Sequence, residues 1–497
     1  MAKISVIGAG VGGLSVAARL AKQGHVVEIY EASDRTGGKC RTEWFGDYSF
    51  DTGPSLLTIP AVYRDLFLKT GKRLELTLDL KPVDPAFAYH FSDGTEVVFP
   101  NLSNPKTYLA IEKSFGADAS KQWKTLMDRA DAMWEVSREP FVESELKSIW
   151  SLLKRKNLLG ELKQISPFTS LRTLTKKYKL DPHLSMIVDR YATYTGSDPR
   201  KAPAVLLTIA FVESTFGAWH ITGGIGKLSE ALETRCRELG VEIYLNKKVA
   251  KINTSANCAT GITLENGEVI SSDLVVANAD SEIVYNNLIE PSVKSAKPER
   301  RKLKKASKSL AGFSLLLGLD NSKGTAVQMQ HHNVYFPNNY DAEFDQIFDK
   351  QVPVSDPTIY ICAPNDKTMV KGENKEAWFV LVNAPRHDPE NGWDWRNGAQ
   401  EYASAIVKKL DQLGLNVSQR LDCMEYRTPL DLQNYAMAPG GSIYGTSSNS
   451  AQSAFLRARN RSKVKNLYCV GGSAHPGGGL PLVGISADIV AEIIGKA

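Results

Sequence analysis

The stretch KISVIGAGVGGLSVAARLAKQGHVVEIYE, residues 3–31, predicts a short β-strand, a glycine-rich turn, a helix and a second strand. Gly8, Gly10 and Gly13 form the pattern G-x-G-x-x-G, which permits a tight turn, the close approach of a pyrophosphate and the packing of helix on strand. The helix N-terminus offers free N–H groups to such a pyrophosphate. We therefore expect a βαβ unit that binds a dinucleotide.

Glu31 follows the second predicted strand directly. A carboxylate at this place can accept hydrogen bonds from both hydroxyls of an adenosine ribose, and it favours an unphosphorylated ribose over that of NADP. The alternative is a glycine-rich turn beside a solvated glutamate, with no ligand. The acid in this context favours the dinucleotide site.

Two further motifs extend the predicted site. RTGGK occupies residues 35–39, and DTGPS occupies residues 51–55. A second glycine pair so soon after the acid suits a longer cofactor whose other half lies extended along the protein, as FAD does. The alternative is that Gly37 and Gly38 only form a turn and that Arg35 is a surface charge.

Taken together, these motifs resemble those of the superfamily of FAD-dependent amine oxidases and carotenoid desaturases. The stretch GGSAHPGGGLPLVGISADIV, residues 471–490, narrows the resemblance to bacterial carotenoid desaturases of the phytoene type. Their flavin motif opens close to G-x-x-x-H-P-G-x-G, which Gly471, His475, Pro476, Gly477 and Gly479 match. The implied fold is α/β, a Rossmann-like FAD-binding domain with an interleaved α+β substrate-binding domain.

The resemblance implies FAD as the cofactor and no metal. The residues expected to bind FAD are Gly8, Gly10, Gly13, Glu31, Arg35, Gly38, Lys39, Gly53, Ser55, Leu56, Val249, Asn278, Gly472, Gly479, Leu480 and Val483. No NAD(P)H site is recognisable, so reduced flavin is expected to pass its electrons to oxygen or a quinone.

The chain order of the motifs predicts a discontinuous FAD-binding domain at residues 1–85, 220–290 and 430–497. Residues 86–219 and 291–429 are expected to form the substrate-binding and membrane-associating domain. Residues 467–470 are expected to form a last strand beside the first, with a helix starting near Gly484. The glycines of residues 221–228 imitate a second dinucleotide site, but no strand obviously precedes them and no acid follows Leu245.

Length and composition set broad limits. A chain of 497 residues with 42% hydrophobic and 23% charged residues predicts two globular domains. The first residues lack the features of a secretory signal, which indicates a cytoplasmic protein. The six cysteines have no C-x-x-C spacing, so a metal site or disulfide framework is not expected, and we interpret them as packing residues.

Two basic segments suggest contact with a membrane. Residues 146–180 hold nine Lys and Arg against one acid, Glu161, interleaved with apolar residues that include Trp150 and Phe168. Such a segment can lie on an anionic bilayer. Residues 294–308 form a second basic run, and in both cases the alternative is a solvated helix face. No nucleic-acid partner is expected, since no base-reading motif accompanies the charge.

The family's reaction takes a hydride and a proton from adjacent carbons of a long apolar polyene. The triple glycine Gly477-Gly478-Gly479 favours a 1'-hydroxycarotenoid 3,4-desaturase, in which a polar contact deep in the substrate passage should read the hydroxyl. The alternatives are a phytoene or lycopene-type desaturase, a flavin oxidase of amines or of a porphyrinogen, and a non-enzymatic prenyl-lipid carrier on the same scaffold.

No acid or base for this reaction is compelled by the sequence. Asp189, Arg190 and Asp198 lie in or near the aromatic stretch YATYTGSDP, which could line a polyene tunnel, although ordinary helix-end and turn chemistry explains them as well. His475 precedes Pro476 in the cofactor motif and is expected to shape that loop rather than to catalyse.

Overall fold

The computed structural model describes residues 1–146, 158–450 and 457–497. Its first sheet is wholly parallel, with neighbouring strands in the order β19 (Leu467–Cys469), β13 (Leu274–Ala277), β1 (Lys3–Ile7), β2 (Val26–Tyr30) and β9 (Glu242–Tyr244). Buried apolar residues fill these strands, as expected of a parallel sheet covered on both faces. The predicted α/β class is confirmed.

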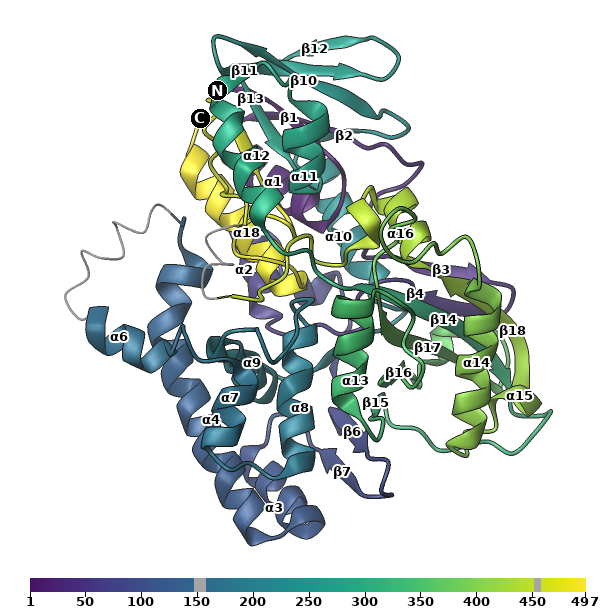
Figure 1. Ribbon diagram of the computed structural model, residues 1–497. Helices are drawn as coiled ribbons and strands as arrows, with labels where there is room; N and C mark the ends of the chain where they lie inside the picture. Colours follow the sequence, from purple (N-terminus) through teal and green to yellow (C-terminus); the bar gives the residue numbers. More distant parts are fainter. Residues whose placement is uncertain (147–157, 451–456) are drawn as a thin grey trace.

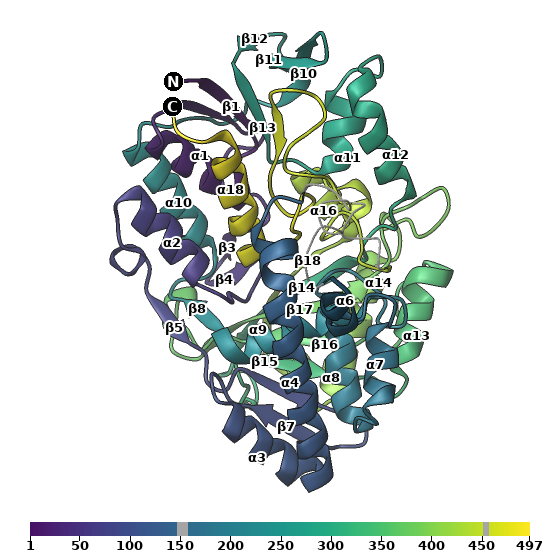
Figure 2. The ribbon, with the colours of Figure 1, turned by 90° about the vertical axis from the view of Figure 1, so that its left-hand side faces the viewer.

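Helices cover one face of this sheet, and a small antiparallel sheet covers the other (Figures 1 and 2). The helices are α1 (Val11–Lys22), α2 (Ala61–Thr70), α10 (Gly226–Glu238) and α18 (Leu480–Ile494). The opposite face carries β10 (Val249–Ser255), β11 (Cys258–Leu264), β12 (Val269–Ser271), α11 (Ser281–Ile283) and α12 (Lys297–Lys305). Both chain termini lie at the same end of the molecule (Figure 1).

The second large sheet is mixed. Its strands follow the order β18 (Leu421–Arg427), β14 (Ala311–Asp320), β17 (Lys375–Ala384), β16 (Ile359–Cys362), β15 (His332–Tyr335), β6 (Phe87–His90) and β7 (Glu96–Phe99). Only β15 and β6 pair in parallel within this sheet. Side chains of β14 alternate between two cores, with Leu316 on one face and Leu315 and Leu317 on the other.

Helices lie on both faces of the mixed sheet. The core that contains Leu316 is covered by α3 (Asn104–Phe115), α4 (Ala117–Arg138), α7 (Leu171–Lys177), α8 (Pro182–Thr193) and α9 (Thr208–Phe216). The core that contains Leu315 and Leu317 is covered by α14 (Ala399–Gln412). The remaining labelled helices are α6 (Leu158–Ile165), α13 (Tyr340–Phe344), α15 (Val417–Arg420) and α16 (Pro429–Ala436). Two short ribbons pair β3 (Thr42–Phe45) with β4 (Tyr48–Asp51) and β5 (Leu80–Pro82) with β8 (Trp219–Ile221).

Three local expectations are wrong. β19 pairs with β13, and β13 lies between β19 and β1, since it pairs in parallel with both. α18 begins at Leu480 rather than near Gly484, since Pro481 fits the first turn of a helix. A strand, β8, does precede the glycines of residues 221–228, but it pairs antiparallel with β5 and lies outside the parallel sheet.

The strands of the parallel sheet come from three separate parts of the chain, around residues 3–30, 242–277 and 467–469. The predicted domain boundaries themselves stay a prediction. None of the described helices combines the length and the apolar character that crossing a bilayer requires.

Candidate functional site

A cavity of about 1060 Å³ brings the two glycine-rich ends of the chain together. Gly8 and Gly10 line it from the turn between β1 and α1, and Gly472 and Gly479 line it from the loop between β19 and α18. Both strands run parallel in one sheet, so the loops at their carboxyl ends open on the same edge. The sheet topology thus explains why distant motifs share one cavity.

Most of the predicted cofactor-binding residues line this cavity: Gly8, Gly10, Glu31, Gly38, Lys39, Gly53, Ser55, Leu56, Val249, Asn278, Gly472, Gly479, Leu480 and Val483. Gly13 and Arg35 are not among its lining residues. Gly13 packs against the turn itself, because a Cβ there would lie 2.1 Å from the Gly8 carbonyl oxygen. The half-exposed Arg35 pairs with Glu43, so its role toward a cofactor stays a prediction.

The turn between β1 and α1 is shaped by close contacts with Asn278. Gly8 has φ +90°, and a Cβ on it would lie 2.7 Å from the Asn278 carbonyl oxygen. The Asn278 side-chain amide donates to the Gly8 carbonyl at 3.3 Å. No side chain caps the start of α1 and no acid lies in its first turn. The positive end of this helix is therefore open to an anion in the cavity.

Glu31 is held in a fixed orientation. Its Oε2 accepts from the Ala9 backbone N–H at 2.7 Å, and its Oε1 accepts from the backbone N–H and hydroxyl of Ser33, both at 2.9 Å. Carboxylate oxygens have about four acceptor positions, so at least one remains for a ligand hydroxyl. The carboxylate is thus preorganised at the cavity edge.

Two cationic side chains, the buried Arg457 and the partly buried Lys39, also line the cavity. Arg457 donates to the carbonyl oxygens of Gly472, Tyr444 and Thr446 at 2.9–3.0 Å, and burial lowers its pKa to about 10. Lys39 donates from Nζ to the Ile443 carbonyl at 3.0 Å, and burial lowers its pKa. Since both side chains line the cavity, they also place positive charge beside it.

The rest of the cavity has a largely apolar lining. Its walls include Phe141, Ile165, Leu206, Ile209, Val212, Phe379 and Leu381. Phe168 also lines it and is 93% exposed, so the apolar surface continues to the outside of the protein. A cavity of this size and polarity suits a long apolar ligand in addition to a cofactor.

A polar cluster interrupts this apolar lining at Glu213, Arg190, Tyr194 and Tyr360. Glu213 lies on α9, and its Oε1 accepts from the Tyr191 hydroxyl at 2.8 Å. Its Oε2 is buried without a partner among the described residues. Burial raises the pKa of Glu213 to about 7, although the hydrogen bond from Tyr191 acts in the opposite direction.

Arg190 lies on α8, beside Glu213 of α9, and is almost wholly buried. Its guanidinium lies 4.9 Å from the ring centroid of Tyr194 and 5.3 Å from that of Tyr360. It donates to the Tyr194 hydroxyl. Among the described residues no carboxylate forms an ion pair with it within 4.0 Å, so aromatic faces stabilise most of this buried charge.

Contacts connect the region of the polar cluster to both the DTGPS motif and the glycine-rich motif at residues 471–490. The Tyr360 hydroxyl lies 2.9 Å from the hydroxyl oxygen of Ser55, in the DTGPS motif. Tyr444, which also lines the cavity, packs so closely on Gly478 that a Cβ there would lie 2.3 Å from its ring. The cluster therefore lies where the second half of the cofactor is expected.

The structure gives the other residues from the sequence different places. Of the three charged residues in or near YATYTGSDP, namely Asp189, Arg190 and Asp198, only Arg190 lines the cavity. Asp189 pairs with Arg172 at 2.6 Å, and Asp198 pairs with Arg200 at 2.9 Å. His475 lies away from the lining, with its Nε2 2.9 Å from the Ser144 carbonyl oxygen, in line with a role in the loop.

Sequence reasoning missed Glu213, Tyr360, Tyr444 and Arg457. A signal existed for Glu213, which is the only charged residue in the stretch LLTIAFVESTF. An acid isolated in an apolar helix is expected to be buried with a partner or to serve a ligand. No comparable signal marks Tyr360 or Tyr444, because aromatic residues are common in cores.

Comparisons with known proteins agree with this geometry. Residues 11–325 match the family described as flavin containing amine oxidoreductase. The chain is 31% identical to 4,4'-diapolycopene oxygenase of Methylomonas sp, covering 99% of this chain and 98% of the relative. It is also 31% identical to 1-hydroxycarotenoid 3,4-desaturase of Flavobacterium sp. (strain P99-3), covering 99% of each. The zeta-carotene-forming phytoene desaturase of Myxococcus xanthus is 31% identical over 99% of this chain and 93% of its own.

Solved structures share the fold. An oxidoreductase from Methanosarcina mazei matches with a TM-score of 0.65 at 18% identity, covering 99% of this chain and 100% of that one. Cyclohexylamine oxidase from Brevibacterium oxydans matches with a TM-score of 0.61 at 15% identity, covering 99% of both. At these identities the likeness is one of fold alone.

Proposed function

The chain belongs to the flavin-containing amine oxidoreductase family, and we propose that it desaturates an acyclic carotenoid that carries a hydroxyl near one end. It is an FAD-dependent oxidoreductase. The observation that carries the proposal is a single cavity that begins at Glu31 and the glycine turn and continues into an apolar passage. The polar cluster of Glu213, Arg190, Tyr194 and Tyr360 interrupts the apolar lining.

The residues present fit FAD. The glycine turn leaves the start of α1 open, and the fixed Glu31 carboxylate retains an acceptor position for a ribose hydroxyl. The start of α18 at Gly479 also has no capping side chain and no acid in its first turn. We propose that α1 and Glu31 hold the ADP portion and that Lys39, Ser55 and the 471–483 loop hold the flavin portion.

The apolar passage fits a polyene. A carotenoid is almost pure hydrocarbon, and the transfer of each CH₂ group from water to an apolar site is favourable by about 0.8 kcal/mol. Ile209, Val212 and Leu206 supply such surface inside the passage, and Phe168 supplies it at the exposed end. The passage would also exclude water and hold the chain in one orientation, which are the main tasks of the protein when a cofactor supplies the chemistry.

Desaturation removes a hydride and a proton from adjacent carbons, and bound FAD supplies the hydride acceptor. We propose that Glu213 Oε2 accepts the proton. This oxygen is buried, belongs to a residue that lines the cavity, and has no hydrogen-bond partner among the described residues. A pKa of about 7 suits a general base at neutral pH, since half of the carboxyls are ionised there. Tyr191 holds the other oxygen and orients the group.

Arg190 suits the recognition of a substrate hydroxyl. The relative from Flavobacterium is named a 1-hydroxycarotenoid 3,4-desaturase, and carbons 1 and 3 of a chain are two bonds apart. A hydroxyl on carbon 1 would therefore lie beside the reacting carbons, so one polar cluster could serve both. Arg190 and Glu213 lie in such a cluster, and Arg190 has donors that no described carboxylate occupies.

Gly478 adds a second reason to favour this branch. The triple glycine suggested it, and the structure shows that the middle glycine is where the Tyr444 ring approaches. An alanine at this position would displace Tyr444, which borders the polar cluster. The glycine thus allows an additional aromatic side chain beside the reacting end of the substrate.

Product analysis tests the proposal. FAD-loaded protein is given, in separate reactions, phytoene, lycopene and a 1-hydroxylated acyclic carotenoid in liposomes. We expect the hydroxylated substrate to lose two hydrogens and its polyene absorbance to move to longer wavelength. Turnover of phytoene alone would contradict the hydroxyl-reading branch, and a colourless protein that resists FAD loading would instead favour a lipid carrier.

An oxygenase is the second candidate, because the identity to 4,4'-diapolycopene oxygenase equals that to the 3,4-desaturase. Arg190 could equally donate to a carbonyl oxygen. The same reactions separate the two functions, since mass spectrometry of an oxygenase product shows added oxygen. The amine oxidases that share the fold are 13–15% identical and give no reason to prefer an amine substrate.

We also propose that the enzyme loads from a membrane surface. Leu162 on α6 and the nearly fully exposed Phe168 line the cavity at its outer end, which places apolar side chains at the entrance. Residues 147–157 of the basic segment, with Trp150, lie outside the described residues. In the second basic run, Lys302 pairs with Glu299 and Arg300 donates to carbonyls, which favours the solvated-face alternative there. Failure to bind anionic liposomes at low salt would refute membrane loading.

A further inference from the structure

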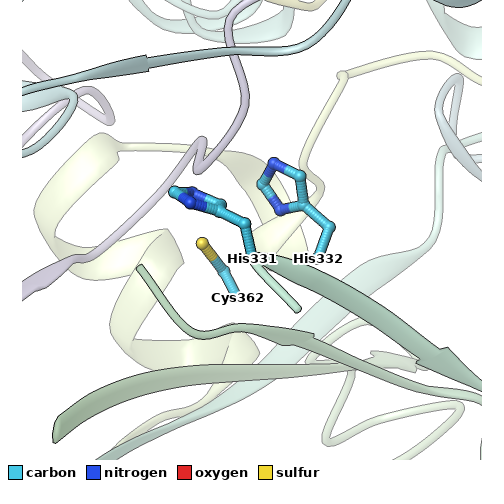
Figure 3. A group of neighbouring side chains, drawn as sticks. All are labelled: His331, His332 and Cys362. Carbon is cyan, nitrogen blue, oxygen red and sulfur yellow. The ribbon is translucent and has the colours of Figure 1, made fainter. Parts of the chain in front are cut away.

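Three side chains of types that bind metals lie close together beside the cavity, where β15 pairs with β16 (Figure 3). His332 and Cys362 are directly opposite each other on these antiparallel strands, so their side chains lie on the same face of the sheet. His331 immediately precedes β15. One ligand atom of each residue lies within 4.8 Å of those of the other two.

The two imidazoles have unused nitrogens. His331 Nε2 and His332 Nε2 are both buried and have no hydrogen-bond partner among the described residues. A buried polar atom left without a partner costs about 1–3 kcal/mol. His332 is fully buried, and Cys362 is 3% exposed. Two orphaned nitrogens beside a buried thiol are therefore a costly arrangement unless something binds them.

The donor atoms suit ligands of a metal. A bound metal ion would bond the Cys362 sulfur as a thiolate and release its proton. Sulfur together with imidazole nitrogen is the donor set that soft or borderline d¹⁰ cations prefer.

We propose that His331, His332 and Cys362 form a binding site for a thiophilic d¹⁰ cation, Zn²⁺ or Cu⁺. Zinc bonds thiolate at about 2.3 Å and imidazole at about 2.0–2.1 Å, so two of its ligand atoms lie at most about 4.4 Å apart. Binding therefore draws the three side chains slightly together. The metal site does not rest on the proposed function, although Tyr360 of the polar cluster contacts His332.

The surroundings give the site a structural consequence. The Tyr360 hydroxyl lies 2.8 Å from His332 Nδ1 and 2.9 Å from the Ser55 hydroxyl, so it links the cluster to the cavity wall. On the other side, the His220 ring centroid lies 5.0 Å from that of His331, and His220 Nε2 lies 2.9 Å from Asp366. The Asp366 carboxylate offsets part of the charge of a divalent ion. A bound cation would fix the His332 ring and, through it, Tyr360.

The experiment titrates the FAD-loaded, chelator-treated protein with Zn²⁺ and, under anaerobic conditions, with Cu⁺, each against a chromophoric competitor. We expect one equivalent of one or both ions to bind. Co²⁺ serves as a spectroscopic probe, because tetrahedral thiolate-bound cobalt absorbs at wavelengths longer than those of flavin. No stoichiometric binding of Zn²⁺ or Cu⁺ to the wild-type protein would overturn the proposal.

Variants assign the ligands. Cys362→Ser should weaken binding at least tenfold, since even changes around a metal ligand cost about 10–100-fold, and it should abolish the thiolate band of cobalt. Cys362→His keeps a ligand and should retain binding. Cys423→Ser is the matched control, because Cys423 lies on β18 of the same sheet and away from the cluster. Unchanged affinity in Cys362→Ser, with normal flavin absorbance, would also overturn the proposal.

Discussion

The two halves of the cavity are built in different ways. At the dinucleotide end, the site is formed mainly by backbone geometry. Gly8 has φ +90°, Gly13 packs on the turn, and the start of α1 is open. At the polar cluster, side chains from three separate elements converge, namely Arg190 from α8, Glu213 from α9 and Tyr360 from β16. The glycine turn is local in sequence, whereas the polar cluster exists only after the chain has folded.

The two halves also manage charge differently. Glu31 accepts three hydrogen bonds from Ala9 and Ser33, so its carboxylate is held in place before any ligand arrives. Glu213 and Arg190 are buried close together, and each keeps polar atoms without an ionic partner among the described residues. A preorganised charge suits tight cofactor binding, whereas a poised one suits proton transfer. The predictions below test this contrast.

Replacing the proposed base should have the largest effect. Glu213→Gln removes the proton acceptor but keeps the shape, and general-base catalysis contributes about 10²–10⁴-fold. We expect the rate of flavin reduction by substrate, measured by anaerobic stopped-flow absorbance, to fall by that factor while flavin binding is unchanged. A fall of less than threefold would remove Glu213 from the mechanism.

The pH profile sharpens this test. A base must be deprotonated to act, so the wild-type rate should rise with pH through about 7, where Glu213 titrates. Tyr191→Phe removes a hydrogen bond that favours the charged carboxylate, so the rise should move to higher pH. A profile that stays in place would show that another group controls it.

The next largest effect is expected at the dinucleotide end. Glu31→Ala should weaken FAD binding about 10–100-fold, since hydrogen bonds to a charged group contribute about 1.5–3 kcal/mol. Fluorescence titration of the apoprotein with FAD measures it. Glu28→Ala is the control, because Glu28 lies on β2, three residues before Glu31, and pairs with Lys3 outside the cavity lining. Equal losses in both variants would contradict the assigned role.

Two glycines allow the effect of a positive φ on stability to be separated from the effect of a close contact. Gly8 and Gly240 have similar φ values, +90° and +81°, but a Cβ on Gly240 meets nothing within 4 Å. Gly8→Ala should therefore be less stable than Gly240→Ala, by about 1–3 kcal/mol of overpacking. Denaturant unfolding compares the two variants, and equal stabilities would show that the contact with Asn278 carries no constraint.

The smallest effect concerns selectivity. Arg190→Met should lower the preference for a hydroxylated over an unhydroxylated carotenoid about tenfold, because one hydrogen bond to the ligand is lost. The ratio of kcat/KM for the two substrates measures this, and the unhydroxylated substrate serves as the internal control. An unchanged ratio would place hydroxyl recognition elsewhere.

Sequence patterns were a good guide wherever backbone geometry decides the structure. The turn at Gly8, the acid at Glu31 and the loop at Gly479 were identified from residue type and order, because few residues other than glycine adopt those conformations or allow that approach. The predicted pairing of β19 with β1 is wrong, since the order of strands in a sheet depends on tertiary packing between distant segments. Chain order alone does not contain that information.

By itself, the sequence determined the α/β fold class and the family, and it predicted the residues of the cofactor site, since these depend on short patterns with a local physical cause. Only the tertiary structure decided which side chains face the apolar passage. Asp189 and Arg190 are neighbours in sequence, yet one pairs with Arg172 and the other lines the cavity. His332 and Cys362 lie thirty residues apart and meet because their strands pair. Burial and strand pairing create such contacts, and no local pattern records them.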